Sequence, residues 1–96
     1  MQATRKIGMP WYTREGFEAA RGVMTDQHAL APTFDEWRLS AEHNEQVARS
    51  VGIEVIRAVI EADTFSAWCA TRNVPPDSKA RTTFAEEAAR QGGPGA

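Results

Sequence analysis

The sequence predicts an α+β domain that is mostly helical, with about four helices and one strand. Four segments begin with a residue that favours a helix N-terminus and continue with apolar residues at helical spacing. One run of β-branched residues, from Ile53 to Glu61, is typical of a strand, and the chain offers no second run of that quality. Together these observations favour helices packed around a single strand.

The length and composition bound this fold further. A chain of 96 residues allows one domain. Its apolar residues include 16 alanines and only two leucines, Leu30 and Leu39, so the core must depend on aromatic side chains. The net charge of −2 excludes a strongly basic nucleic-acid binder. No stretch approaches 18 apolar residues, so we expect no membrane span and a cytoplasmic protein.

The first two predicted helices have recognisable N-termini. The first is expected over 14–24 with Thr13 as its N-cap. The second has a full capping box, in which Thr33 accepts from the Glu36 backbone N–H and the Glu36 side chain reaches back to Thr33. It runs to residue 50 or 51, and Gly52 takes the left-handed exit. Its expected apolar face is Phe34, Trp37, Ala41, Ala48 and Val51, with Val47 at the edge, and its charged face is Arg38, Glu42, Glu45 and Arg49.

The strand and the last two helices complete the prediction. The strand is apolar on both faces, as in a strand that is covered on two sides. Asp63 is the expected N-cap of a short helix over 64–72, which Asn73 ends before two prolines. Asp77 or Ser78 caps the last helix, which reaches about residue 91. The early aromatic residues of the four helices are expected to meet around the strand as core anchors: Phe17, Trp37, Phe65 and Phe84.

The domain is expected to cover residues 9–91. Residues 1–8 are polar and without periodicity, which predicts a flexible N-terminal extension. Residues 92–96 are rich in glycine, which predicts a disordered tail.

The sequence contains no pattern for catalysis, a cofactor or a metal. One cysteine and two histidines, His28 and His43, are too few for a zinc site, and no cofactor is expected. Nucleotide loops and the hydrolase nucleophile turn are also missing from the sequence. Cys69 and Trp68 are expected on the buried face of their helix, with Trp68→Ala costing about 3–5 kcal/mol of stability. These observations lean away from an enzyme.

Three residues are candidates for an interaction surface. Trp11 and Tyr12 precede the first helix and are amphipathic, so we expect them to be partly exposed. Arg57 interrupts the apolar strand, where it must either reach solvent or pair with a carboxylate from another element. Anion recognition by Arg57 is a further hypothesis.

Three stretches of the C-terminal half resemble a family of short uncharacterised bacterial proteins. They run from Gly52 to Ile60, from Asp63 to Cys69, and from Asp77 to Ala85, and the opening MPWYT at 9–13 is similar to the usual start of these proteins. The resemblance covers about residues 9–90. It implies a small stand-alone protein and brings no activity or site residues with it.

Two functions follow as hypotheses. A lone strand would leave backbone groups unpaired, so we expect a homodimer in which the segment from Ile53 to Ile60 pairs antiparallel with its two-fold mate. Pairing with a weak extended piece around Ile7 to Tyr12 of the same chain is the alternative. The first hypothesis is a non-enzymatic protein-interaction or regulatory module with an unknown protein partner. The alternative is a ribbon-helix-helix-like DNA-binding regulator with the ribbon from Ile53 to Glu61, whose order of strand and helices is similar. Nucleic acid is the less favoured partner, because Arg57 is the one basic side chain on that strand.

Overall fold

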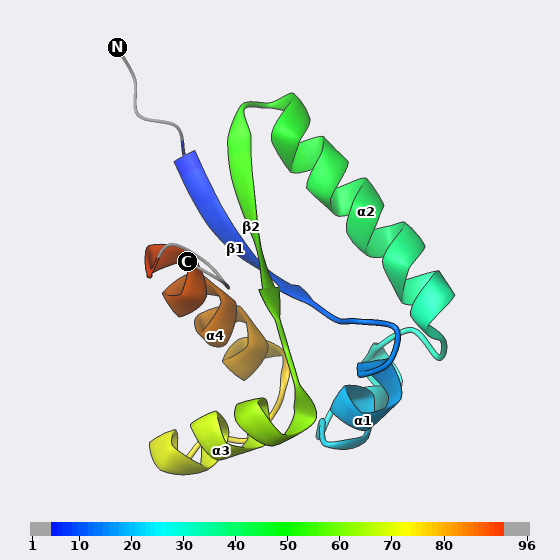
Figure 1. Ribbon diagram of the computed structural model, residues 1–96, viewed down its shortest axis with the longest axis vertical. Helices are drawn as coiled ribbons and strands as arrows, with labels where there is room; N and C mark the ends of the chain where they lie inside the picture. Colours follow the sequence, from blue (N-terminus) through cyan, green and yellow to red (C-terminus); the bar gives the residue numbers. More distant parts are fainter. Residues whose placement is uncertain (1–4, 92–96) are drawn as a thin grey trace.

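A computed structural model describes residues 5–91, and over this range four α-helices surround two strands (Figure 1). The α+β class and its mostly helical content are confirmed. The expected tail at 92–96 lies outside the described residues. The elements follow in the order β1 (Arg5–Trp11), α1 (Phe17–Gly22), the short 3₁₀ helix η1 (Gln27–Ala29), α2 (Phe34–Ser50), β2 (Ile53–Val59), α3 (Ala62–Arg72) and α4 (Ser78–Arg90).

The strand β2 has a partner within its own chain. β1 pairs with it in parallel, from Arg5 beside Ile53 to Trp11 beside Val59. The prediction of a flexible extension over residues 1–8 is therefore wrong for residues 5–8, and residues 1–4 lie outside the described range. The weak extended piece around Ile7 to Tyr12 lies in and just after this second strand, so the alternative of pairing within the chain is the arrangement that the structure has. Antiparallel pairing across a homodimer is thus no longer needed to satisfy this edge of β2.

The residues of β1 explain why it was hard to recognise. It contains Gly8 and Pro10, which are both unfavourable in a strand. The Ile60 backbone N–H donates to the Trp11 carbonyl at 2.8 Å, and since bonding alternates along a strand, the nitrogen of Pro10 faces away from β2. A proline at that position removes no ladder hydrogen bond.

Helices lie on both sides of the strand pair, as the apolar character of both faces predicts. Figure 1 shows α4 on one side of the strands and α2 on the other. The backbone of β1 touches α4 at Gly8, where a Cβ atom would lie 1.9 Å from the carbonyl oxygen of Ala85. Only glycine allows this approach.

Several helix ends agree with the sequence prediction. The Thr33 hydroxyl accepts from the Glu36 N–H at 3.2 Å, and it donates to the Glu36 carboxylate at 3.1 Å. The Glu36 side chain thus meets the Thr33 hydroxyl instead of its backbone N–H. Gly52 has a φ of +86° and Asn73 a φ of +56°, so both take the left-handed exit. Asp77 caps α4 by accepting from the Ala80 N–H at 3.0 Å.

Two helix starts differ from the prediction. The Thr13 hydroxyl accepts from the Gly16 N–H at 3.0 Å, which closes a turn, and α1 begins only at Phe17. α3 begins at Ala62, so Asp63 lies inside its first turn and is not the N-cap. An acidic residue there still favours the positive end of the helix dipole. The helix η1 was not expected from the sequence.

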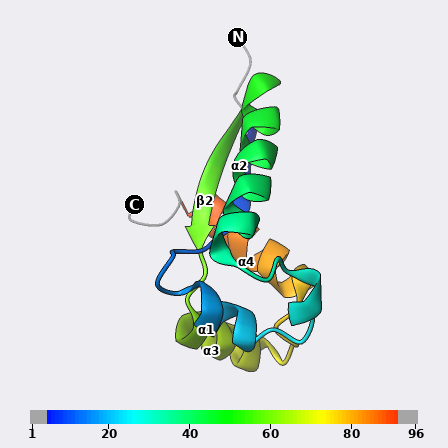
Figure 2. The ribbon, with the colours of Figure 1, turned by 90° about the vertical axis from the view of Figure 1, so that its right-hand side faces the viewer.

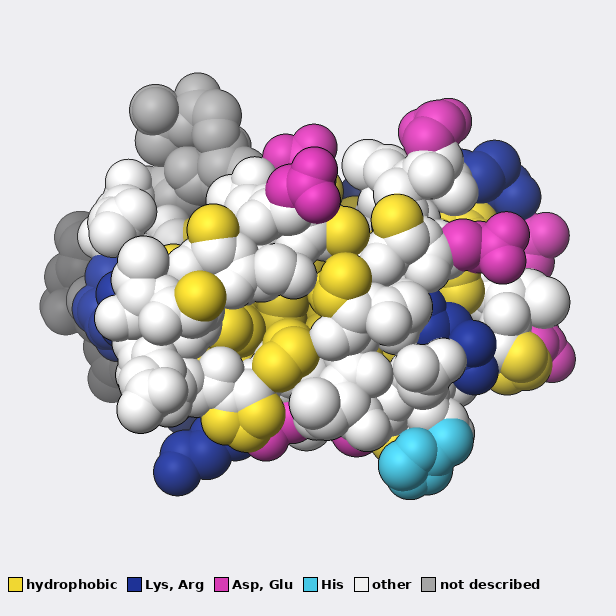
Figure 3. All heavy atoms as spheres, turned by 90° about the horizontal axis from the view of Figure 1, so that it is seen from below, with side chains coloured by type: hydrophobic (Ala, Val, Ile, Leu, Met, Phe, Trp, Pro, Cys, Tyr) yellow, Lys and Arg dark blue, Asp and Glu magenta, His cyan; other side chains and the backbone are white. Residues whose placement is uncertain are grey.

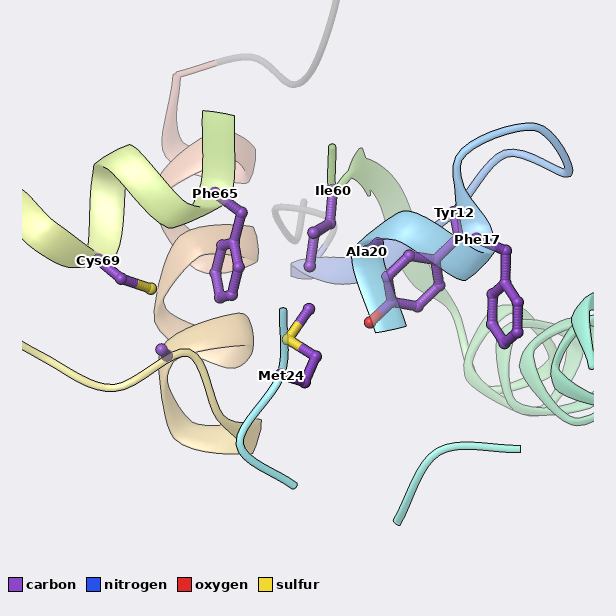
Figure 4. Packing of buried hydrophobic residues seen from close by; sticks show 8 residues of the cluster. Tyr12, Phe17, Ala20, Met24, Ile60, Phe65 and Cys69 are labelled. Atoms are coloured by element: carbon purple, nitrogen blue, oxygen red, sulfur yellow. The ribbon is translucent and has the colours of Figure 1, made fainter. Parts of the chain in front are cut away.

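The core joins side chains from residues 12–24 to side chains from residues 60–80. Figure 4 shows Ile60 and Met24 between Phe65 on one side and Tyr12 and Phe17 on the other. The expected aromatic anchors do meet around this core: Phe17 and Phe65 are fully buried within it, and Trp37 and Phe84 pack against it.

Candidate interaction surface

Trp11 and Arg57 lie together on the face of the sheet that α2 covers. The guanidinium carbon of Arg57 is 3.9 Å from the centroid of the Trp11 ring, a close cation–π contact. Trp11 also meets Trp37 of α2 edge to face, with ring centroids 5.0 Å apart. The side chain of Arg57 remains 45% exposed, and Trp11 is half-buried. The pairing of β1 with β2 brings these two predicted residues to one place.

The partner of Arg57 is Glu45 of α2. Its carboxylate accepts from Nε at 2.7 Å and from Nη2 at 2.8 Å, a bidentate pair. The hydrogen bonds from Arg57 hold the pKa of Glu45 below its usual range and raise the pKa of Arg57. The expectation of a carboxylate from another element is confirmed. Since Glu45 already satisfies this guanidinium, the structure offers little support for free anion recognition by Arg57.

Glu45 itself contradicts the sequence prediction. Helical spacing put it on the charged outer face, yet its side chain is only 7% exposed. Its second neighbour, Arg49, lies 3.4 Å away on the same helix. A buried carboxylate needs such partners, and only the fold brings Arg57 across from β2 to supply one.

Tyr12 is not part of any surface. It is 2% exposed and packs edge to face against Phe17 and Trp37. The expectation of a partly exposed Tyr12 is wrong, because the turn after β1 directs its ring into the core. Its hydroxyl has no hydrogen-bond partner among residues 5–91, and burial raises its pKa to about 12.

Replacing Tyr12 with phenylalanine should leave the protein equally stable or stabilise it by up to about 1 kcal/mol, because the buried hydroxyl has no partner to lose. The raised pKa favours the neutral phenol in the folded state. The parent protein therefore has its full stability below pH 10 and loses stability as the pH rises from 10 toward 12, where Tyr12 ionises.

The chain has one tyrosine, so the ultraviolet absorbance of tyrosinate reports this titration directly. Urea unfolding of Tyr12→Phe at neutral pH and at alkaline pH completes the test. A titration midpoint near 10 in the folded protein, or a loss of more than about 1 kcal/mol in the variant, would contradict the buried, unpaired hydroxyl.

A second ion pair lies near this hydroxyl and was not anticipated from the sequence. Arg81 of α4 binds Asp26 at 2.8 and 3.0 Å, and the Arg81 side chain is 9% exposed. The hydrogen bond from Arg81 lowers the pKa of Asp26. The pair ties the segment before η1 to α4, so its role is to hold the core closed.

The outer face of α2 carries exposed apolar side chains. Leu39, Val47 and Val51 are 72%, 51% and 70% exposed. Val51 was expected on the apolar inner face, and this is wrong: it is the C-cap residue that follows α2, and its side chain is largely exposed. Figure 2 looks onto α2 with no other element in front of it. We call Leu39, Val47 and Val51 the α2 outer face.

Cys69 is a core thiol. It is 2% exposed, and burial raises its pKa, with Asp77 adding to the effect. We therefore expect the native protein at neutral pH to resist a soluble thiol reagent, which should label Cys69 only as fast as the protein opens. Labelling at the same rate in native and in urea-unfolded protein would contradict this placement. Cys69→Ser should cost roughly 1–3 kcal/mol.

No three His, Cys, Asp or Glu side chains among residues 5–91 gather closely enough to hold a metal ion. No helix among the described residues has the length and apolarity for crossing a membrane.

No family model matches the sequence, no curated protein matches it, and no solved structure matches the fold. The resemblance to short bacterial proteins therefore stays a prediction, and the functional argument depends on the surface itself.

Proposed function

We propose that this chain is a non-enzymatic protein-interaction or regulatory module that binds a partner through the α2 outer face. The supporting observation is that Leu39, one of only two leucines, is 72% exposed on a helix whose opposite side is packed. Exposed apolar side chains that cluster on one element are typical of interaction sites. A small domain buries a small share of its surface, so it depends on placing most of its large apolar side chains in the core.

The shape of this surface suggests the kind of partner. A single helix is convex, and its anchors at Leu39, Val47 and Val51 lie four or eight residues apart. Such a helix face docks into an apolar groove of another protein. The exposed residues between the anchors carry no carboxylate or guanidinium on that side: Ser40, His43, Asn44 and Gln46.

Self-association remains part of this proposal. The homodimer through the segment from Ile53 to Ile60 stays a prediction, and it would have to use the edge of β2 that faces away from β1. A second copy can also cover the α2 outer face. A helix of 17 residues is about 25 Å long, so two such helices packed against each other would bury less surface area than a stable dimer interface of standard size. We therefore favour a different protein as the partner.

The alternative of a ribbon-helix-helix-like DNA regulator finds little support in this geometry. Such a ribbon needs an antiparallel strand pair with a free face, whereas β2 pairs in parallel with β1 and has helices on both sides. Any DNA binding that phosphate contacts drive would weaken steeply as salt rises, which separates the two hypotheses. A cytoplasmic location stays a prediction.

The proposal is tested with two matched double variants. Leu39→Gln/Val47→Gln removes the apolar anchors of α2, and Thr82→Gln/Glu86→Gln changes two exposed residues of α4, away from that surface. Both should fold within about 0.5 kcal/mol of the parent, because all four positions are exposed. A partner captured from the native cells by the parent chain should be retained by the second variant and lost by the first.

Equal retention by both variants would overturn the proposal for this surface. Sedimentation at several concentrations adds the second readout. A monomer at every concentration, combined with no retained partner, would argue against an interaction module altogether. A dimer that only the Leu39→Gln/Val47→Gln variant disrupts would place a second copy on the α2 outer face.

A further inference from the structure

A pocket lies between the end of α3 and the start of α4, away from the α2 outer face. Its volume is about 430 Å³, within the roughly 300–1,000 Å³ range of small-molecule sites. Its walls include Trp68 and Arg72 of α3, Val74 and Pro75 of the connecting loop, and Lys79 and Thr83 of α4. Figure 3 shows the lower face of the molecule, with apolar side chains near its centre and several Lys and Arg side chains toward its margins.

The walls of this pocket are fixed by the fold. Arg72 and Glu87 form a bidentate pair at 2.6 and 2.7 Å, which joins α3 to α4. The left-handed Asn73 turns the chain, and the Val74 N–H donates to the Cys69 carbonyl at 3.1 Å. The loop therefore does not need to be ordered by a ligand, and pre-formed pockets bind at lower entropic cost.

The apolar part of the pocket centres on Trp68. Its ring stacks on Phe65 with centroids 6.0 Å apart and meets Phe84 edge to face at 5.4 Å. These contacts hold the indole in one orientation while the residue remains half-exposed. Val74, which is 39% exposed, and Pro75 extend the apolar surface. An aromatic ring of a ligand fits such a wall.

The charged part of the pocket favours an anion. Lys79 is exposed and makes no ion pair with any of the residues 5–91, whereas the Arg72 guanidinium at the same rim is already paired with Glu87. The one carboxylate in the lining is Asp77, whose Oδ1 already accepts from the Ala80 N–H. The Asp77 carboxylate caps α4 and already occupies the positive end of this helix, so Lys79 is the cation that remains at the rim.

We propose that this pocket binds a small aromatic carboxylic acid, with its ring among Trp68, Val74 and Pro75 and its carboxylate at Lys79. Apolar walls supply most of the contact, and one unpaired cation at the rim selects the charge. This site is independent of the α2 outer face, so its ligand is a candidate regulator of the module.

The test is an NMR titration of ¹⁵N-labelled protein with indole-3-acetate as the probe. Indole-3-acetamide is the matched neutral probe, since it differs only in the charged group. We expect saturable shifts at Lys79, at Thr83 and at the indole N–H of Trp68, with the acid bound about two- to fivefold more tightly than the amide. Equal affinities, or shifts that do not saturate or that centre on other residues, would overturn the proposal.

Two variants on α4 sharpen the test. Lys79→Gln should weaken binding of the acid about two- to fivefold and leave binding of the amide unchanged. Arg90→Gln, at an exposed position in the last turn of the same helix, should change neither. If both variants weaken binding of the acid equally, the preference for the acid comes from the overall charge of the protein, and the proposed site is refuted. A peptide ending in tryptophan that binds far more tightly than indole-3-acetate would replace the small acid by a protein terminus as the ligand.

Discussion

Gly8→Ala should destabilise the protein by about 3 kcal/mol or more. A Cβ at this position would lie 1.9 Å from the carbonyl oxygen of Ala85 and 2.4 Å from its carbonyl carbon. Both atoms belong to the backbone of α4, so no side chain can rotate away. Either β1 must leave β2 or α4 must move off the sheet, and each change breaks contacts of the core. A chain of this size has on the order of 5–14 kcal/mol of stability in total.

Urea unfolding followed by circular dichroism measures this loss. Gly22→Ala is the matched control, because a Cβ there meets no atom within 4 Å and the residue lies in the last turn of α1. It should stabilise the protein by roughly 0.5–1 kcal/mol. If Gly8→Ala behaves like Gly22→Ala, the packing of β1 on α4 is not as described.

The same contact explains why β1 is only weakly indicated by the sequence, as an extended piece around Ile7 to Tyr12. Local signals define α2 and α4: Thr33 and Asp77 cap their own helices through contacts three residues away. β1 has no such local signal, since its residues alternate poorly and include Gly8 and Pro10. Its partner β2 lies far along the chain, and Gly8 is required only because α4 packs there.

The candidate site shows the same division. Arg57 was predicted either to reach solvent or to pair with a carboxylate from another element, and it does both. That the carboxylate is Glu45 could not be predicted, since helix periodicity assigns Glu45 to solvent and only the approach of α2 to β2 buries it. The prediction that Tyr12 is partly exposed was wrong for a related reason. Its burial depends on the turn after β1, a strand that the sequence indicates only weakly.

Phe65→Ala should cost about 3–5 kcal/mol, the other large effect that the structure predicts. Phe65 is fully buried, in contact with Trp68 and Phe84, and lies at the junction of α3 with the rest of the core. Truncation removes the apolar contacts of a whole ring and leaves a cavity between two helices, which close packing does not refill. Because α3 has 11 residues, it depends on this packing for its stability.

Trp68→Ala should cost clearly less than Phe65→Ala, about 1–3 kcal/mol, although the sequence alone assigns Trp68 about 3–5 kcal/mol. Trp68 is half-exposed and leaves no closed cavity, because its outer side already faces the pocket between α3 and α4. The stability that Trp68 does contribute comes from its stack on Phe65 and from the Arg72 guanidinium above its ring.

Urea unfolding of both single variants and of the double variant measures the difference. Since the rings touch, the double variant should cost less than the sum of the two. A Trp68→Ala loss equal to or greater than that of Phe65→Ala would show that Trp68 is a core residue and that the pocket beside it closes in solution.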